Sequence, residues 1–113
     1  MNINNTIMAY SVNLGKYGFN LGSRIQGRKV FEEIAKSMEA EGGSEKIVID
    51  FTGVRFMSLS FATELLDNLK YSNLFGAILI KETSPMIKNQ LRFVIREMNE
   101  KNKDFQTEVA LMD

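Results

Sequence analysis

Two short runs of apolar residues, at positions 46–51 and 75–80, constrain most strongly what this chain can fold into. Each run is continuous and rich in β-branched side chains, which is typical of a strand covered on both faces of a parallel sheet. Segments with apolar residues at helical spacing separate and follow the two runs. This alternation predicts an α/β fold with right-handed crossovers and helices packed against the sheet.

Three segments carry the helical pattern, and each has a plausible start signal. Ser23 and Gln26 have the spacing of a capping box, and Ser84-Pro85 combines an N-cap serine with a proline in the first turn. Gly42-Gly43 predicts the end of the first helix. The predicted helices run from Ser23 to Gly42, from Ser58 or Ser60 to about Tyr71, and from Ser84 to about Lys103.

Weaker strand patterns complete the chain at residues 6–12, between Gly15 and Gly22, and at 105–111, the last as a sheet edge. The resulting order predicts a mixed sheet with about three helices. The 113 residues suit one domain spanning positions 1–113. Periodicity assigns to the core, rather than to a cofactor site, two methionines and a set of phenylalanines. These are Met86, Met98, Phe31, Phe51, Phe56 and Phe61.

The composition removes several classes of function. The chain has no cysteine and no histidine, which excludes thiol nucleophiles, disulfides, zinc sites of the Cys/His kind and imidazole catalysis. Acidic and basic residues number 14 each, so no net charge draws the protein to nucleic acid or to anionic lipid. We therefore expect no enzyme activity, no metal and no cofactor. Without a signal-like N-terminus or a long apolar stretch, we expect a cytoplasmic protein that does not bind membranes.

The run from Ile47 to Leu65 is the most informative part of the chain. A buried strand ends in Asp50-Phe51, a Gly53-Val54 turn and the pair Phe56-Met57 follow, and hydroxyl residues stand at the start of a helix. Together with Gly22-Ser23-Arg24 and Gly27-Arg28 upstream, this pattern resembles the STAS-like family of unknown function. It is close to the anti-sigma-factor antagonist (STAS) domains, and the resemblance covers roughly residues 20–80.

The resemblance implies a partner-switching module that docks on a histidine-kinase-like ATP-binding protein or an anti-sigma factor. It implies partner contacts at Asp50, Ser58, Ser60 and Glu64. In the antagonists, phosphorylation of a serine at the helix start ends the docking, and here Leu59 occupies that position while Ser58 takes the place of an acidic residue. Ser58 and Ser60 on either side are the candidate phosphosites. A phosphate would add about −1.5 to −2 charges to the contact surface.

Structural roles explain the same residues equally well. Ser58 or Ser60 can serve as the N-cap of the helix, and Asp50 can orient the amides of its own loop. An active site built from Asp50, Glu64 and Ser60 is the least favoured interpretation, because no nucleophile and base pair is visible.

The alternative function is a sensor of small ligands or anions at the helix start from Gly22 to Lys29. Ser23, Arg24 and Arg28 are its candidate contacts, because a helix N-terminus offers N–H groups to an anion. Gly27 would allow a ligand or a partner backbone to come close. Against this, a solvated surface also accounts for the arginines, and close packing on the sheet also accounts for Gly27. The sequence does not specify an oligomeric state.

Overall fold

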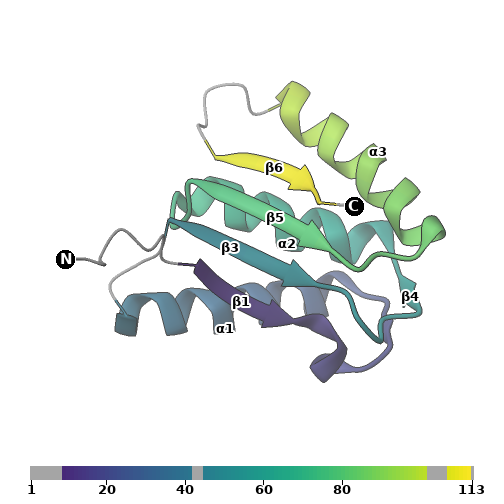
Figure 1. The fold of residues 1–113 in the computed structure, drawn as a ribbon, viewed down its shortest axis with the longest axis horizontal. Helices are drawn as coiled ribbons and strands as arrows, with labels where there is room; N and C mark the ends of the chain where they lie inside the picture. The colour runs from purple at the N-terminus through teal and green to yellow at the C-terminus, as the bar shows by residue number, and fades with distance from the viewer. Residues whose placement is uncertain (1–8, 42–44, 102–106, 113) are drawn as a thin grey trace.

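A four-stranded sheet forms the centre of the protein, seen in a computed structural model that describes residues 9–41, 45–101 and 107–112 (Figure 1). The strand order is β1-β3-β5-β6, and every pairing of these strands is parallel. The four strands are β1 (Ala9–Asn13), β3 (Lys46–Asp50), β5 (Ala77–Lys81) and β6 (Glu108–Leu111). The α/β class is confirmed. The sequence predicts one mixed sheet. The structure has the four-stranded sheet and, separate from it, a two-stranded ladder whose strands are also parallel.

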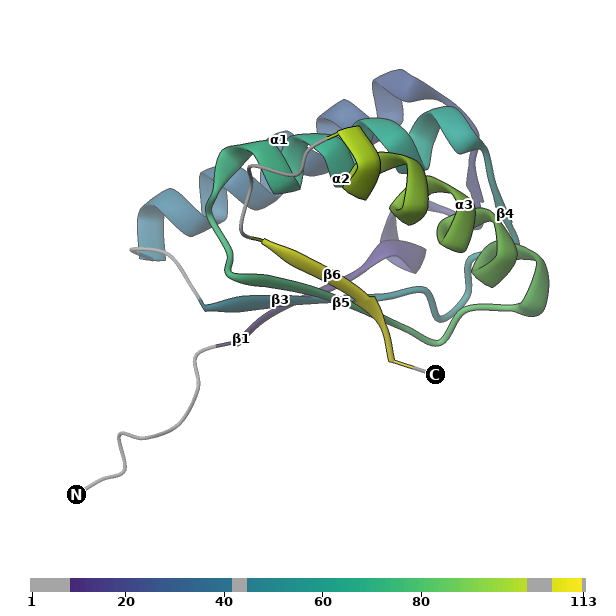
Figure 2. The same cartoon turned by 90° about the horizontal axis from the view of Figure 1, so that it is seen from above.

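Three helices lie on the same face of the sheet, as Figure 2 shows from above. They are α1 (Arg24–Glu41), α2 (Leu59–Ser72) and α3 (Pro85–Lys101). The residues of β3 and β5 alternate between buried and half-buried, so no described element covers the other face. The prediction that these strands are covered on both faces is wrong. Val48 and Leu79 are apolar although they point away from the helices, and this hides the alternation in the sequence.

The separate ladder pairs β2 (Asn20–Leu21) with β4 (Phe56–Met57). A short 3-10 helix at Leu14–Tyr17 leads from β1 toward β2. The strand predicted between Gly15 and Gly22 is therefore confirmed, whereas β4 falls in a segment that the sequence presents as a turn. This ladder connects the start of α1 to the start of α2.

The predicted helix starts are confirmed in detail. The Ser23 Oγ accepts a hydrogen bond from the Gln26 N–H at 3.1 Å, and the Gln26 side chain accepts one from the Ser23 N–H at 3.1 Å. The Ile87 N–H donates to the Ser84 Oγ at 3.3 Å. The predicted helix stop at Gly42-Gly43 lies outside the described residues. So do positions 6–8, 102–103 and 105–106 of the other predicted elements.

The core fills the space between the sheet and the helices, with Phe61 fully buried at its centre. Phe51 and Met98 are also buried, and Phe31 is partly buried against this core. Phe56 and Met86 do not belong to it, because 48% and 61% of their surfaces are exposed. The prediction that they belong to the core is wrong. No helix in the described part of the chain is long and apolar enough to span a bilayer.

Candidate functional site

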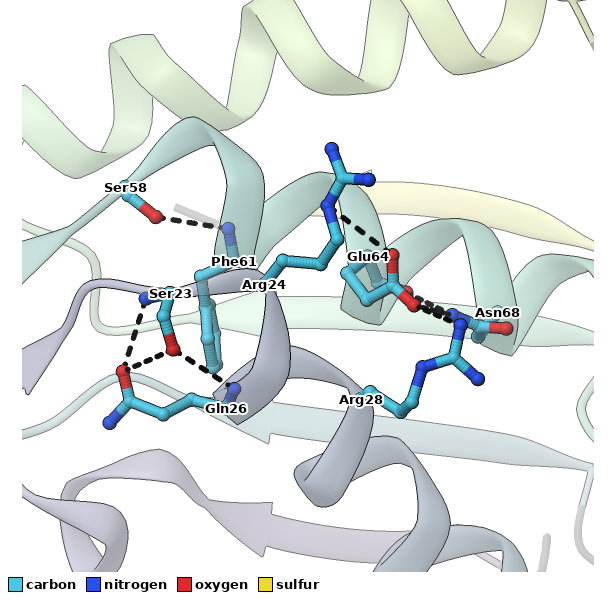
Figure 3. Close-up of polar contacts among 8 residues, drawn as sticks. All are labelled: Ser23, Arg24, Gln26, Arg28, Ser58, Phe61, Glu64 and Asn68. Carbon is cyan, nitrogen blue, oxygen red and sulfur yellow. Dashed lines mark hydrogen bonds and ion pairs between the residues drawn. The ribbon is translucent and has the colours of Figure 1, made fainter.

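Ser58 is the N-cap of α2 (Figure 3). Its backbone is extended, and its Oγ accepts a hydrogen bond from the Phe61 N–H at 3.0 Å. The Ser58 N–H donates to the Leu21 carbonyl at 2.9 Å, which ties the helix start to β2. Of the two serines that could cap this helix, Ser58 does so, and its hydroxyl oxygen is therefore hydrogen-bonded within the fold.

Ser60 lies one residue inside α2 and is exposed. Its hydroxyl makes no hydrogen bond with any residue that the structure describes. Two large apolar side chains that precede it in the sequence are also exposed, Leu59 by 44% and Phe56 by 48%. We call Phe56, Leu59 and Ser60 the α2 entry surface. It combines apolar area with one accessible hydroxyl.

Glu64 follows Ser60 by one helical turn and is largely covered, with 13% of its side chain exposed. Its carboxylate pairs with Arg28 at 2.8 Å and lies 3.9 Å from the Arg24 Nε. The Asn68 amide donates to the same carboxylate at 3.1 Å (Figure 3). Glu64 therefore joins α2 to α1, and little of this predicted contact residue is exposed to solvent.

The predicted anion site at the start of α1 is occupied by the protein's own side chains. The N–H groups of Gly22 and Ser23 both donate to the Gln26 Oε1, at 2.9 and 3.1 Å. Arg24 and Arg28 turn away to Glu64 on α2. The structure thus does not gather Ser23 and the two arginines around one ligand position.

Gly27 lies where α1 and α2 approach each other closely. A Cβ atom at this position would stand 2.7 Å from the Phe61 carbonyl oxygen and 3.1 Å from the Glu64 Cβ. Real Cβ atoms essentially never come that near to a backbone oxygen. Packing against α2, rather than against the sheet or a ligand, accounts for the glycine.

Asp50 ends β3 and makes its hydrogen bonds within its own turn. Its Oδ1 accepts from the Thr52 hydroxyl at 2.6 Å and from the Thr52 N–H at 2.8 Å. These bonds, the hydroxyl's first, hold the pKa of Asp50 below its ordinary value. Its register partner on β5 is Lys81, and no contact joins it to Ser58, Ser60 or Glu64 in the described part of the chain. Asp50 therefore orders its own loop, which agrees with the structural interpretation of this residue.

The exposed Phe56 and Leu59 are candidate site residues that the sequence pattern does not reveal. Phe56 belongs to an apolar pair that is typical of a core, and Leu59 stands out in the sequence only because it replaces a serine. In the alternating two-residue strand β4, Met57 is buried and Phe56 faces outward. No grouping of three or more acidic residues suited to a metal ion occurs among the described residues.

These features define an α/β domain with three helices on one face of its sheet and an exposed helix start beside the small ladder. The family profile described as a STAS-like domain of unknown function (DUF4325) matches residues 26–88, which is more than half of the chain. The chain belongs to this family, and the resemblance in the sequence is confirmed. The match runs from α1 into α3 and includes the α2 entry surface. No curated protein and no solved structure matches the chain.

Proposed function

We propose that this chain is a non-catalytic regulatory module that binds another protein through the α2 entry surface. The observation that carries the proposal is the exposure of two large apolar side chains, Phe56 in β4 and Leu59 at the start of α2, together with the accessible hydroxyl of Ser60. Exposed apolar side chains are unremarkable singly, but neighbouring ones on a small protein mark an interaction surface. Aromatic and aliphatic anchors of this kind supply most of the affinity at protein interfaces.

The surface is held rigidly, which favours binding. The Ser58 cap and the Leu21 carbonyl fix the start of α2 on one side. On the other side, the Gln90 amide of α3 donates to the Met57 carbonyl at 2.8 Å. A surface fixed in this way loses little conformational entropy when a partner binds.

The partner that we propose is a histidine-kinase-like ATP-binding protein, with the chain acting as a partner-switching component. The support is membership of a STAS-like family together with the position of the surface at the start of α2, where antagonist domains of similar pattern dock. The absence of cysteine and histidine and the balanced charge fit a binding role without a cofactor, nucleic acid or membrane.

Phosphorylation of Ser60 is the form of control that this geometry favours. Ser60 is accessible, whereas the hydroxyl of Ser58 is engaged as the cap. A phosphate at the second residue of a helix interacts favourably with the helix dipole, so α2 would remain folded. The added charge would lie next to Leu59 and weaken apolar contact with a partner.

Site-specific photo-crosslinking in the native cell tests the binding surface. A photoreactive phenylalanine analogue replaces Ser60, and the matched control carries it at Ser11, which is exposed on the uncovered face of the sheet. We expect one predominant product from position 60, containing a protein with a histidine-kinase-like ATP-binding domain, and none from position 11. Equal products from both positions, or none from position 60, would contradict the proposal.

The switch is tested with that partner in purified form. We expect Ser60→Asp to weaken binding at least about tenfold relative to Ser60→Ala, as judged by calorimetry, because a desolvated charge at an interface is strongly unfavourable. Incubation with the partner and ATP, followed by mass spectrometry, should place a phosphate on Ser60. Phosphate on neither serine, or equal affinity of the two variants, would remove the phosphoswitch and leave the binding role.

A further inference from the structure

A groove lies between the middle of α2 and the C-terminal half of α3. Hydrogen bonds link this part of the fold to its surroundings, from Gln90 to the Met57 carbonyl at 2.8 Å and from the Lys70 amine to the Asn99 side chain at 3.3 Å. The cavity has a volume of about 130 Å³. Its lining comprises Thr63, Asp67, Phe93, Val94, Glu97, Met98 and Lys101.

The floor of the groove is apolar. Val94 and Met98 are buried, with 4% and 2% of their surfaces exposed. Phe93 borders the groove and is 49% exposed, although a large aromatic side chain on a helix normally gains from burial. The groove therefore suits an aliphatic stem more than a polar or bulky group.

The charged residues on the rim of the groove indicate which chemical group the end of the aliphatic stem should carry. Asp67 and Glu97 contribute two carboxylates, and Lys101 contributes one cation. Burial is the main reason that the pKa of Asp67 is raised, and Lys101 offsets this only in part. Glu64 on the neighbouring turn is the other charge felt by Asp67, and it raises the pKa further. The rim thus has an excess of negative charge beside a partly desolvated carboxylate.

We propose that this groove receives an arginine side chain from the docking partner. The three methylene groups would lie on Val94 and Met98, and the guanidinium would bind Asp67 and Glu97 while stacking on Phe93. Arginine fits better than lysine because its planar, weakly hydrated cation pairs with carboxylates and stacks on aromatic rings at the same time.

The groove lies on the same side of α2 as Leu59, one member of the α2 entry surface. Leu59, Thr63 and Asp67 are spaced four residues apart, and residues at this spacing share one helix face. A single partner segment can therefore cover both. The inference rests on the proposed function only in naming the docking protein as the source of the arginine, since the groove can be tested without that protein.

The probe is Nα-acetyl-arginine N-methylamide, titrated into the isotopically labelled protein and followed by amide chemical shifts. The isosteric citrulline derivative is the neutral control, and the lysine derivative tests the preference for guanidinium. We expect shifts clustered at residues 63–67 and 93–101, with citrulline binding at least about tenfold more weakly because a charge-assisted hydrogen bond is lost.

Two variants complete the test. Asp67→Asn with Glu97→Gln should abolish the arginine-specific shifts, whereas Glu108→Gln, an exposed carboxylate on the opposite face of the sheet, should leave them intact. Equal shifts with citrulline, shifts located elsewhere, or shifts that survive the double substitution would overturn the proposal. Stronger binding of the lysine derivative would overturn the choice of arginine.

The groove and the proposed function can fail separately. Crosslinking at position 60 without arginine-specific shifts would reject the groove and leave the binding module. Arginine-specific shifts without a crosslinked partner would leave a groove for basic side chains and reject the α2 entry surface.

Discussion

The two long sides of α2 differ in how they meet their neighbours. Toward α1 the contact is closed, because Gly27 lets the two backbones approach and Glu64 pairs with Arg24 and Arg28 across the boundary (Figure 3). Toward α3 a cavity remains, with Phe93 half-exposed at its edge. The contact with α1 is closely packed and pairs its charges within the protein. The cavity beside α3 leaves part of Phe93 exposed near the carboxylates of Asp67 and Glu97. We infer that the α1 side of α2 maintains the fold and that the rest of its surface is available for binding.

The largest expected effect comes from adding one methyl group to the closed contact. Gly27→Ala should lower the free energy of unfolding by about 1–2 kcal/mol, since overpacking costs about 1–3 kcal/mol and exceeds the helix propensity that alanine adds. Chemical denaturation measures the change. The comparison is Thr63→Leu on the side of α2 that faces α3, which we call the open side. We expect this substitution to alter the free energy of unfolding by no more than about 0.5 kcal/mol because the groove has room for the larger side chain. Equal losses in both variants would show that the two sides do not differ.

The second effect separates the two serines at the start of α2. Ser58→Ala should lower the free energy of unfolding by about 1 kcal/mol, because the Phe61 N–H loses its acceptor. Ser60→Ala should change it by less than about 0.5 kcal/mol, as for an exposed position whose hydroxyl bonds to none of the described residues. Thermal unfolding of both variants checks this. A larger loss for Ser60 would mean that its hydroxyl has a structural role.

A smaller effect is expected from the ion pairs of the closed contact. Arg28→Ala should lower the free energy of unfolding by about 0.2–1 kcal/mol, since the arginine is largely exposed and pairs of this kind contribute little. The loss should shrink in concentrated salt, where the charges are screened. A salt-independent loss would indicate that packing of the arginine stem, and not its charge, is the source.

The smallest expected effect is a pH dependence of stability that comes from Asp67 on the open side of α2. The pKa of Asp67 is raised above its ordinary value of 3.8, so its contribution to stability is present at low pH and is lost as the pH rises through the folded pKa. Asp67→Asn should therefore be slightly more stable than the wild type at neutral pH, and the difference should vanish below the ordinary pKa. Urea unfolding at pH 3 and pH 7 measures this. A destabilised variant at pH 7 would show that the fold needs the carboxylate.

The elements that the sequence predicts correctly are those specified by local patterns. The β-branched run at 46–51 and its counterpart at 75–80 become the two central strands. Ser23 with Gln26 and Ser84 with Pro85 mark helix starts, because a cap depends on residues three or four positions apart.

What the sequence does not reveal depends on contacts between distant segments. Val48 is apolar on a face that no described helix covers, and nothing local distinguishes it from a core residue. The turn of Arg24 and Arg28 toward Glu64, 36 residues after Arg28, requires α1 and α2 to be side by side. Phe56 is exposed because β4 pairs with β2, and a two-residue strand leaves no periodicity to read.

The most direct test of the account is amide hydrogen exchange of the protein, alone and in complex with the partner that crosslinks at position 60. We predict that the complex slows exchange along residues 56–67 and 93–101. Exchange in β1 and in the part of α1 facing away from α2 should stay unchanged. Protection confined to the sheet, with α2 and α3 exchanging as in the free protein, would contradict the claim that a partner binds on the open side of α2.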